Sequence, residues 1–546
     1  MFIPKLFTCL KDYNKDMFFK DFVAGLVVAI IALPLSIALA IASGVSPEKG
    51  LITAIIGGFI VSLLGGSRVQ IGGPTGAFVV IVLGIMSKYG LEGLIIATFM
   101  AGIIMILMGL FKMGNMIKYI PYPITTGFTS GIAVIIFSSQ IKDFFGLTID
   151  YVPGDFFAKW HVYLSHMRHI NLTALGVGLA TVGIIVYWPK VNKKVPGAFV
   201  AILVTTLVAF IFKLDLPTIE SQFGQISSSI PAPSIPDLSL NMVRELFMSA
   251  VAIALLGCIE SLLSAVVADG MIGGNHRSNM ELVGQGVANI GSALFGGIPV
   301  TGAIARTAAN VKNGGRTPVA GMVHAVTLFF MMLILMPYVK YIPMASLAGI
   351  LIVVAYNMGE WDEFKSLKSA PKSDCLVFLT TFSLTIVFDL IVAIEIGMVL
   401  AAFLFMKRMA DVTKCDYISG RDRGLHDSFG HFMGKKTSSE IDVYEVTGPF
   451  FFGAADKFIK VIKSVQQAPK VLILKLTHVP VIDATGYAAL LRFQEICDKH
   501  KIQLLVVGLQ DDPLETLEKY GFIDLVGREH VYPNLNQALI RAKSLV

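Results

Sequence analysis

Long apolar blocks alternate with short polar breaks along the first 410 residues of the chain. An apolar run of about 20 residues is what an α-helix needs to cross a bilayer, and shorter runs are allowed where Gly and Pro interrupt them. The pattern predicts fourteen membrane spans, at 22–43, 51–65, 71–87, 93–111, 124–145, 172–188, 196–212, 245–266, 281–295, 298–311, 318–337, 345–358, 374–391 and 392–408. Because seven is odd, two sets of seven spans must insert with opposite orientation. The predicted fold is therefore an α-helical membrane protein with a 7+7 inverted repeat.

The pattern changes after residue 410. We expect a transmembrane transport domain over 1–410, a polar linker over 411–438 and a small α/β domain over 439–546. In the last range, short β-branched runs alternate with amphipathic stretches. They predict strands at 441–446, 471–476 and 502–507, and helices at 454–465, 486–500, 513–519 and 535–542.

Composition narrows the function classes. Hydrophobic residues make up 55% of the chain and charged residues 15%, with a mean hydropathy of +0.72, which excludes a soluble globule. The net charge of +6 comes without a basic patch interleaved with aromatic residues, so no nucleic-acid partner is expected. The five cysteines have no CxxC spacing, which argues against a metal site, and no sequence feature calls for a cofactor. No P-loop, HExxH or GxSxG motif indicates an enzyme or an ATP-driven pump.

Lysine and arginine in the loops predict the orientation of the spans. With the N-terminus inside, the cytoplasmic loops collect many more of these residues than the outer loops do. We therefore expect a multi-pass protein of the cell (inner) membrane, embedded in the lipid bilayer, with both termini and the α/β domain in the cytoplasm.

Two short stretches in the apolar region match each other. Gly73-Pro74-Thr75-Gly76-Ala77-Phe78 matches Gly297-Ile298-Pro299-Val300-Thr301-Gly302-Ala303-Ile304 through the shared Thr-Gly-Ala. Each stretch first breaks a helix and then starts one, which predicts a segment that is extended on one side and helical on the other. The helix start leaves backbone N–H groups free at the middle of the bilayer. Such a pair of half-helices indicates an anion site in a repeat-built transporter.

The predicted anion site consists of residues at these two helix starts and a few neighbours. The threonines are candidates to cap the helices or to donate hydroxyls, and the glycines let an anion approach the backbone. The alternative explanation of the glycines is close helix packing. Ser36 follows Pro34, which frees a backbone carbonyl in the first span. The predicted substrate-binding residues are Thr75, Gly76, Ala77, Phe78, Thr301, Gly302, Ala303, Arg306 and Ser36.

Two charged residues lie deep in apolar spans, where a charge is costly without a partner or a polar cavity. Arg306 is the strongest fixed positive charge available to an anion. Glu260 has only Ser261 and Ser264 as polar neighbours, and a carboxylate in such surroundings tends to bind a proton. We therefore predict that Glu260 and Ser264 form the coupling-ion site, for H+ or alternatively Na+. An alternative interpretation of Glu260 is that it only neutralises the charge of Arg306. An alternative for Arg306 is that it pairs with Glu260 or extends to the cytoplasm.

One short motif in the α/β domain is a candidate functional feature. It is the turn Asp483-Ala484-Thr485-Gly486, between a predicted strand and a predicted helix. An Asp N-cap explains the turn structurally. A regulatory or phosphorylatable Thr485, next to Asp483, is the second interpretation.

The chain resembles, from end to end, the sulfate permease (SulP) family of anion transporters with a C-terminal STAS domain. The resemblance rests on Gly72–Gly76, Ile259–Ser264, Gly302–Thr307, Gly314–Gly321, Phe388–Leu390 and Asp483–Gly486. It implies core and gate domains that move like an elevator, commonly in a homodimer, with an anion between the starts of spans three and ten. Family members can carry a basic residue where Arg306 lies. Family members that couple to sodium can have Asp and Thr at the positions of Glu260 and Ser264. The Glu–Ser pair of this chain differs from them and favours proton coupling.

Secondary active transport of a small anion, by proton-coupled symport, explains all of these features together. Sodium-coupled symport and uncoupled exchange of chloride and bicarbonate remain alternatives, whereas a membrane-tethered signalling scaffold would give the buried charges no role. The sequence leaves open which anion is carried, among sulfate, bicarbonate, chloride and small dicarboxylates. It also leaves open which cytoplasmic partner the STAS domain binds.

Overall fold

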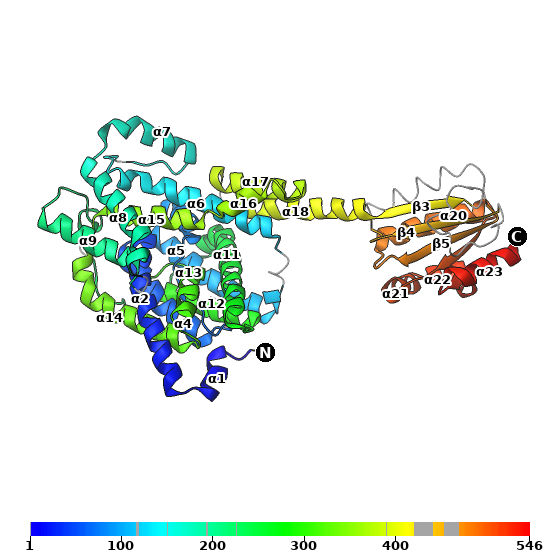
Figure 1. The fold of residues 1–546 in the computed structure, drawn as a ribbon, viewed down its shortest axis with the longest axis horizontal. Coiled ribbons are helices and arrows are strands. Elements are labelled where there is room, and N and C mark those ends of the chain that lie inside the picture. The colour runs from blue at the N-terminus through cyan, green and yellow to red at the C-terminus, as the bar shows by residue number, and fades with distance from the viewer. Residues whose placement is uncertain are drawn as a thin grey trace. The chain divides into compact units, whose positions relative to one another are not determined.

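The computed structural model describes residues 2–115, 120–149, 151–192, 195–224, 226–388, 390–419, 440–451 and 469–546. The chain forms two compact units, Met1–Met398 and Val399–Val546 (Figure 1). The division falls within helix α18 (Leu390–Val412), slightly before the predicted boundary at residue 410. Most of the predicted linker and the predicted helix 454–465 lie outside the described residues.

The first unit is helical (Figure 1). Its main elements are α1 (Lys5–Cys9), α2 (Lys15–Ala42), α3 (Pro47–Ile52), the π-helical turn η2 (Thr53–Gly57), α4 (Gly58–Leu64), β1 (Gly72–Gly73), α5 (Phe78–Leu110), α6 (Tyr122–Phe144), α7 (Phe156–His166), α8 (Leu172–Val191), α9 (Gly197–Ile211), α10 (Ile219–Phe223), α11 (Leu240–Ile272), α12 (Ser278–Leu294), β2 (Thr301–Gly302), α13 (Ile304–Lys312), α14 (Val319–Val339), α15 (Met344–Met358), α16 (Trp361–Ser366) and α17 (Lys372–Val387).

These helices pack as two bundles. In the first, α5 packs extensively against α11 and α12, and α2 against α14. In the second, α6 packs against α15 and α17, and α8 against α9 and α15. Contacts between the bundles are much less extensive and run mainly from α2 to α9 and α15, and from α5 to α6. The site described below belongs to the first bundle and faces the second.

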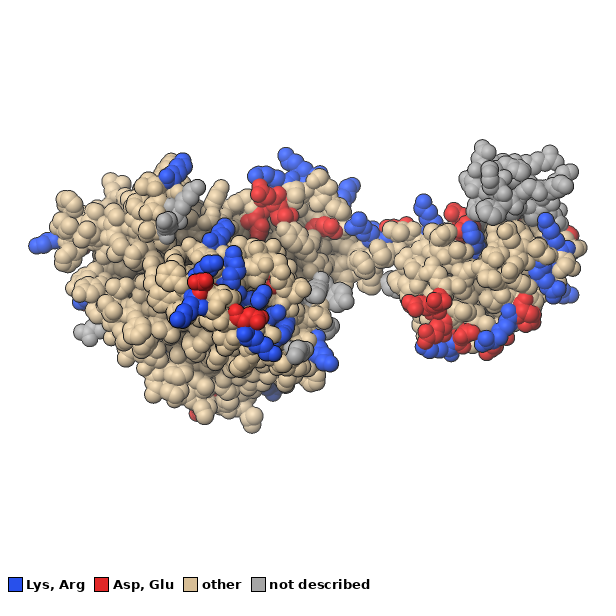
Figure 2. All heavy atoms as spheres, turned by 60° about the horizontal axis from the view of Figure 1, so that its bottom comes forward, with Lys and Arg blue, Asp and Glu red and all other residues tan. Residues whose placement is uncertain are grey.

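Eight described helices are long and apolar enough to cross a membrane: Lys15–Ala42, Pro47–Leu64, Phe78–Leu110, Tyr122–Phe144, Leu172–Val191, Leu240–Ile272, Val319–Val339 and Met344–Ser366. On the face shown in Figure 2, most of the surface of the first unit carries no charged side chain, as lipid contact requires. Several predicted spans correspond to shorter helices, such as α13 with nine residues. The count of fourteen spans in a 7+7 repeat therefore stays a prediction.

The third and fourth predicted spans form one element, α5, with an interruption at Gly90. Gly90 has φ 65° and ψ −166°, a conformation that glycine adopts without steric cost. The residues before Gly90 form the first half-helix, and the residues after it pack against α12 along the rest of α5.

The second unit contains a five-stranded sheet in the order β3-β4-β5-β6-β7. β3 and β4 are antiparallel and the remaining neighbours are parallel. The sheet elements and helices are β3 (Lys414–Ser419), β4 (Ile441–Thr447), β5 (Val471–His478), α20 (Ala484–Lys499), β6 (Gln503–Val507), α21 (Asp511–Lys519), α22 (Phe522–Val526), β7 (Val531–Tyr532) and α23 (Leu535–Leu545). The described strands and helices predicted from the sequence are confirmed. β3 is an addition, because it lies inside the range 411–438 that the sequence analysis assigns to a linker.

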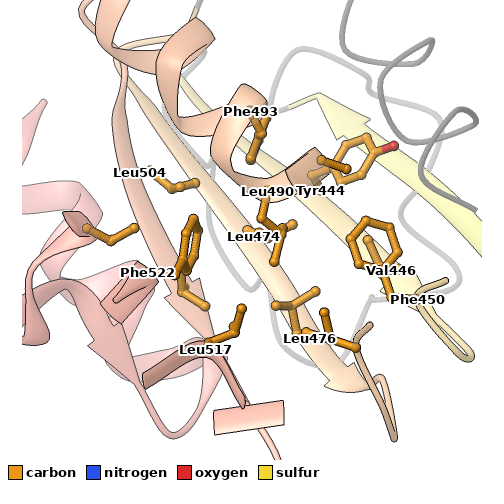
Figure 3. Close-up of a cluster of buried hydrophobic side chains, with 14 of the residues drawn as sticks. Tyr444, Val446, Phe450, Leu474, Leu476, Leu490, Phe493, Leu504, Leu517 and Phe522 are labelled. Atoms are coloured by element: carbon orange, nitrogen blue, oxygen red, sulfur yellow. The ribbon is translucent and has the colours of Figure 1, made fainter. Parts of the chain in front are cut away.

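Alternating side chains give this sheet two apolar faces. Tyr444 and Leu474 on one face pack with Leu490 and Phe493 of α20 and with Phe522 of α22 (Figure 3). The alternate residues of the same strands, such as Val443 of β4 and Ile473 of β5, point to the other face of the sheet. They form a second cluster with α23. The second unit therefore has a hydrophobic core of its own.

Candidate anion-binding site

The two matching stretches meet in the first bundle as a short antiparallel strand pair. β1 lies beside β2, with Gly72 opposite Gly302 and Gly73 opposite Thr301. Helix α5 begins at Phe78 and helix α13 begins at Ile304, shortly after these strands. The backbone pairing therefore brings together two helix starts that are more than 200 residues apart in sequence.

Both helix starts lack a side-chain cap. The N-cap residues are Ala77 and Ala303, whose methyl side chains cannot accept a hydrogen bond from the first turn. Of the two roles expected for Thr75 and Thr301, capping is therefore wrong, and both hydroxyls instead donate to groups on α11. Each helix start carries a partial positive charge that favours anions by about 0.3–1 kcal/mol at a surface and up to ~2 kcal/mol when partly buried.

Glu260 on α11 lies against the first helix start. Its Oε2 accepts a hydrogen bond of 2.7 Å from Thr75 Oγ1, and both residues are partly buried. Thr301 at the second start donates to the carbonyl of Gly257, at 2.9 Å. Ser264, one turn after Glu260, is fully buried and donates to Thr307 on α13, at 3.3 Å. Helix α11 thus contacts both half-helices.

Arg306 on α13 reaches across to the first half-helix. Its Nη2 donates to the carbonyl oxygen of Pro74, and its guanidinium lies next to Gly73. The side chain is 3% exposed, and Nη1 is buried without a hydrogen-bond partner. In the described part of the chain, Arg306 bonds Pro74 and Glu260 bonds Thr75, and no direct ion pair connects the two charged side chains. A buried donor that is not used within the protein is available to an anion.

The two predicted glycines have different surroundings. A side chain at Gly76 would lie 2.9 Å from Met358 Sδ and 3.1 Å from Ile136 Cδ1, so the first helix start faces α15 and α6 of the second bundle. At Gly302, the space that a side chain would need is filled by the carboxamide of Gln70. Gly76 is therefore in close contact with the second bundle, whereas Gly302 is in close contact with Gln70 of the first bundle.

The remaining predicted binding residues are buried. Ala77, Phe78 and Ala303 are at most 7% exposed. Ser36 on α2 is also buried, and its Oγ has no hydrogen-bond partner. In the described part of the chain no group of three His, Cys, Asp or Glu side chains is placed to hold a metal ion.

Three further polar residues join this site, and the sequence analysis assigns none of them to it. Ser261 Oγ lies 2.7 Å from Thr301 Oγ1 and accepts from the amide of Gly302. Thr307 accepts from the amide of Ile71, at 3.1 Å. Gln70 donates to the carbonyl of Ser261, at 3.1 Å. Ser261 and Thr307 directly follow Glu260 and Arg306 in sequence, which is the signal that could have identified them.

The family model named "Sulfate permease family" matches residues 18–381. The chain belongs to the sulfate permease family. A second model, the STAS domain, matches residues 433–538, so this member of the family combines a helical membrane transporter fold with a STAS domain.

Relatives of known name span nearly the whole chain. A putative sulfate transporter of Bacillus subtilis, YvdB, is 43% identical over 96% of this chain and 97% of its own length. The bicarbonate transporter BicA of Picosynechococcus sp. is 30% identical over 96% of this chain and 94% of its own length. Among solved structures, the transmembrane domain of a cyanobacterial BicA matches with a TM-score of 0.65 and 31% identity, covering 70% of this chain and 98% of that chain. SLC26A9 matches with a TM-score of 0.88 at 18% identity, over 99% and 93% of the two chains, which shows the shared fold.

In the STAS domain of this permease, Asp483 is the N-cap of α20. Its Oδ1 accepts a hydrogen bond of 2.7 Å from the amide of Gly486, which confirms the structural explanation of the turn. Thr485 lies exposed in the first turn of α20.

Proposed function

We propose that this permease carries out secondary active transport of a small anion of the sulfate, bicarbonate or C4-dicarboxylate class, by proton-coupled symport. The relatives named as sulfate and bicarbonate transporters support the substrate class. The observation that carries the proposal is the pair of uncapped helix starts joined by β1 and β2, with the unused Nη1 of Arg306 beside them. Thr75 to Phe78, Thr301 to Ala303, Arg306 and Ser36 are the proposed substrate-binding residues.

Glu260 supports proton coupling because it is hydrogen-bonded to Thr75, at the helix start where the anion would bind. An ionised Glu260 carboxylate would repel an anion bound at this helix start, and a proton on the carboxylate removes this repulsion. The anion and the proton therefore strengthen each other's binding, and this coupling is reciprocal. Ser264 and Thr75 supply the hydroxyls near this carboxylate.

Sodium-coupled symport is the second candidate. Carboxylate and hydroxyl oxygens, as supplied by Glu260 and Thr75, are also ligands for a hard cation. Uncoupled exchange, for example of chloride and bicarbonate, needs the same anion site but no titratable carboxylate, so it leaves the Glu260 contact unexplained.

The two bundles support an elevator movement in which the first bundle carries the site past the second. Extensive packing within each bundle and sparse contacts between them are what a rigid-body movement requires. The proposal further places the protein in the cell (inner) membrane with both termini in the cytoplasm. It includes a homodimer and a cytoplasmic partner of the STAS domain, for which Asp483 and Thr485 are the proposed regulatory residues.

Transport by the purified protein in proteoliposomes tests the proposed function. We expect at least one of sulfate, bicarbonate, chloride and succinate to accumulate when the outside is acidified, with or without sodium. Accumulation driven only by a sodium gradient would establish the second candidate instead. Exchange without accumulation under either gradient would contradict coupling.

A disulfide between the bundles should stop the movement. Because Met358 lies beside Gly76, we expect Gly76→Cys with Met358→Cys, in a background without the five native cysteines, to cross-link under oxidation. Uptake should then fall at least tenfold and recover on reduction. Because Gly76 is also a proposed binding residue, the baseline is the same double variant kept reduced, and the two single variants control for the effect of the oxidant. Uptake by the cross-linked protein equal to that of the reduced protein would contradict the elevator movement.

A further inference from the structure

Helix α12 carries a stripe of four polar side chains, Glu281, Gln285, Asn289 and Ser292. Their spacing of four, four and three residues places them on one face of the helix, and all four are fully buried. We call this stripe the α12 ladder. Buried polar side chains in a membrane helix are costly unless they have partners, so the contacts of the ladder indicate its role.

The first contact holds the chain that leads into β1. Glu281 Oε2 accepts from the amides of Gly66 and Ser67, at 2.7 and 2.9 Å. Its Oε1 accepts from the side chains of Gln70, at 3.0 Å, and Gln285, at 2.8 Å. The same Gln70 nitrogen also donates to the carbonyl of Ser261. Glu281 is thereby connected to the helix that contacts both half-helices.

The second contact holds the chain that leads into β2. Asn289 bonds both backbone groups of Val300, accepting from its N–H at 3.0 Å and donating to its C=O at 2.8 Å. Ser292 donates to the carbonyl of Ile298, at 2.7 Å, and Thr53 of the π-helical turn accepts from the amide of Ile298, at 2.8 Å. Asn289 therefore pairs with Val300 as a neighbouring strand would, one residue before Thr301.

Another face of α12 packs closely on α5, in the part of α5 that follows Gly90. A side chain at Gly286 would overlap the backbone of Gly102 on α5, and one at Gly102 would overlap the backbone of Gly286. This close approach allows α12 and α5 to move only as one body. Helix α12 therefore both holds Val300, through Asn289, and packs against α5.

We propose that the α12 ladder sets the separation of the two helix starts, and that Asn289 is a positioning residue that determines which sizes of anion fit between them. This inference rests on the proposed function, because it concerns the same anion site. Removing the Asn289 carboxamide leaves the N–H and C=O of Val300 buried without partners. The chain that leads into β2 must then shift, while Glu281 still holds the chain that leads into β1.

The test compares Asn289→Leu with Asn279→Leu in proteoliposomes, using radiolabelled sulfate and chloride. Asn279 is a matched control on the same helix, since its side chain accepts from the amide of Gly114, at 2.9 Å, and not from the chain that leads into β1 or β2. We expect Asn289→Leu to raise the KM for the better of the two substrates about tenfold, the loss expected for about 1.4 kcal/mol of binding energy. The ratio of the sulfate and chloride KM values should change at least threefold. Asn279→Leu should keep that ratio.

The ratio of two KM values measured in one preparation does not depend on how much of the protein is folded. Thermal unfolding of the purified variants with increasing anion gives the same affinities without transport. An unchanged KM ratio in Asn289→Leu, or a fall in maximal rate alone, would overturn the positioning role. Absence of uptake and of anion-dependent stabilisation in the wild type with each of sulfate, bicarbonate, chloride and succinate would instead overturn the proposed function, and this inference with it.

Discussion

Replacing Glu260 with glutamine is expected to abolish acid-driven accumulation of the anion while leaving exchange across the membrane. Glutamine keeps an oxygen that can accept the hydrogen bond from Thr75, but it cannot bind and release a proton. With the membrane potential clamped, one coupled proton sustains about tenfold accumulation per pH unit of gradient, equivalent to about 1.4 kcal/mol. In Glu260→Gln this accumulation should disappear.

The matched control is Glu395→Gln, which makes the same chemical change at an exposed position of α18. It should accumulate the anion as the wild type does. Full proton-driven accumulation by Glu260→Gln would remove Glu260 from the coupling mechanism, and an equal loss in both variants would show that the effect is not specific to this site.

Replacing Arg306 with alanine is expected to weaken anion binding by roughly 10- to 100-fold. This range corresponds to the loss of one charge-assisted hydrogen bond, about 1.5–3 kcal/mol. The side chain is buried and has one unused donor beside the helix starts. Removing it also leaves the carbonyl of Pro74 without the donor that it has in the wild type. The measurement is the KM for uptake together with anion-dependent thermal stabilisation.

Arg316→Ala is the control for lost positive charge, because Arg316 is exposed at the loop after α13 and bonds the carbonyls of Val311 and Gly315. Arg306→Lys should recover part of the affinity, since lysine keeps the charge but loses the planar fork of donors. An Arg306→Ala variant with wild-type KM and wild-type stabilisation would exclude Arg306 from the substrate site.

The sequence was sufficient for the parts of the structure that depend on local patterns. The repeated Thr-Gly-Ala, with glycine and proline inside apolar runs, predicts two interrupted segments, and both helix starts lie within three residues of the motif. Short β-branched runs likewise predict β4, β5 and β6, and these runs are apolar at successive positions because both faces of that sheet are covered by apolar clusters.

The sequence was insufficient where a residue's partner is distant in the chain. Thr75 looks like a helix cap locally, but its hydroxyl bonds Glu260, 185 residues away. The register of β1 with β2 likewise depends on two segments that meet only after folding. β3 was assigned to the linker because its sequence contains polar residues and lacks a long apolar run. Its six residues form a strand because they pair with β4.

The α12 ladder shows an intermediate case. The spacing of Glu281, Gln285, Asn289 and Ser292 can be seen in the sequence, yet the same spacing would fit polar contacts with any neighbouring helix. Only the structure shows that Glu281, Asn289 and Ser292 bond backbone groups of the chain that leads into β1 and β2.

The most direct test of the account is an experimental density map of the protein with a transported anion bound. We expect density for the anion between the first turns of α5 and α13, within hydrogen-bond distance of their backbone amides and of Arg306 Nη1. Anion density elsewhere in the first unit, with both helix starts unoccupied, would contradict the central claim.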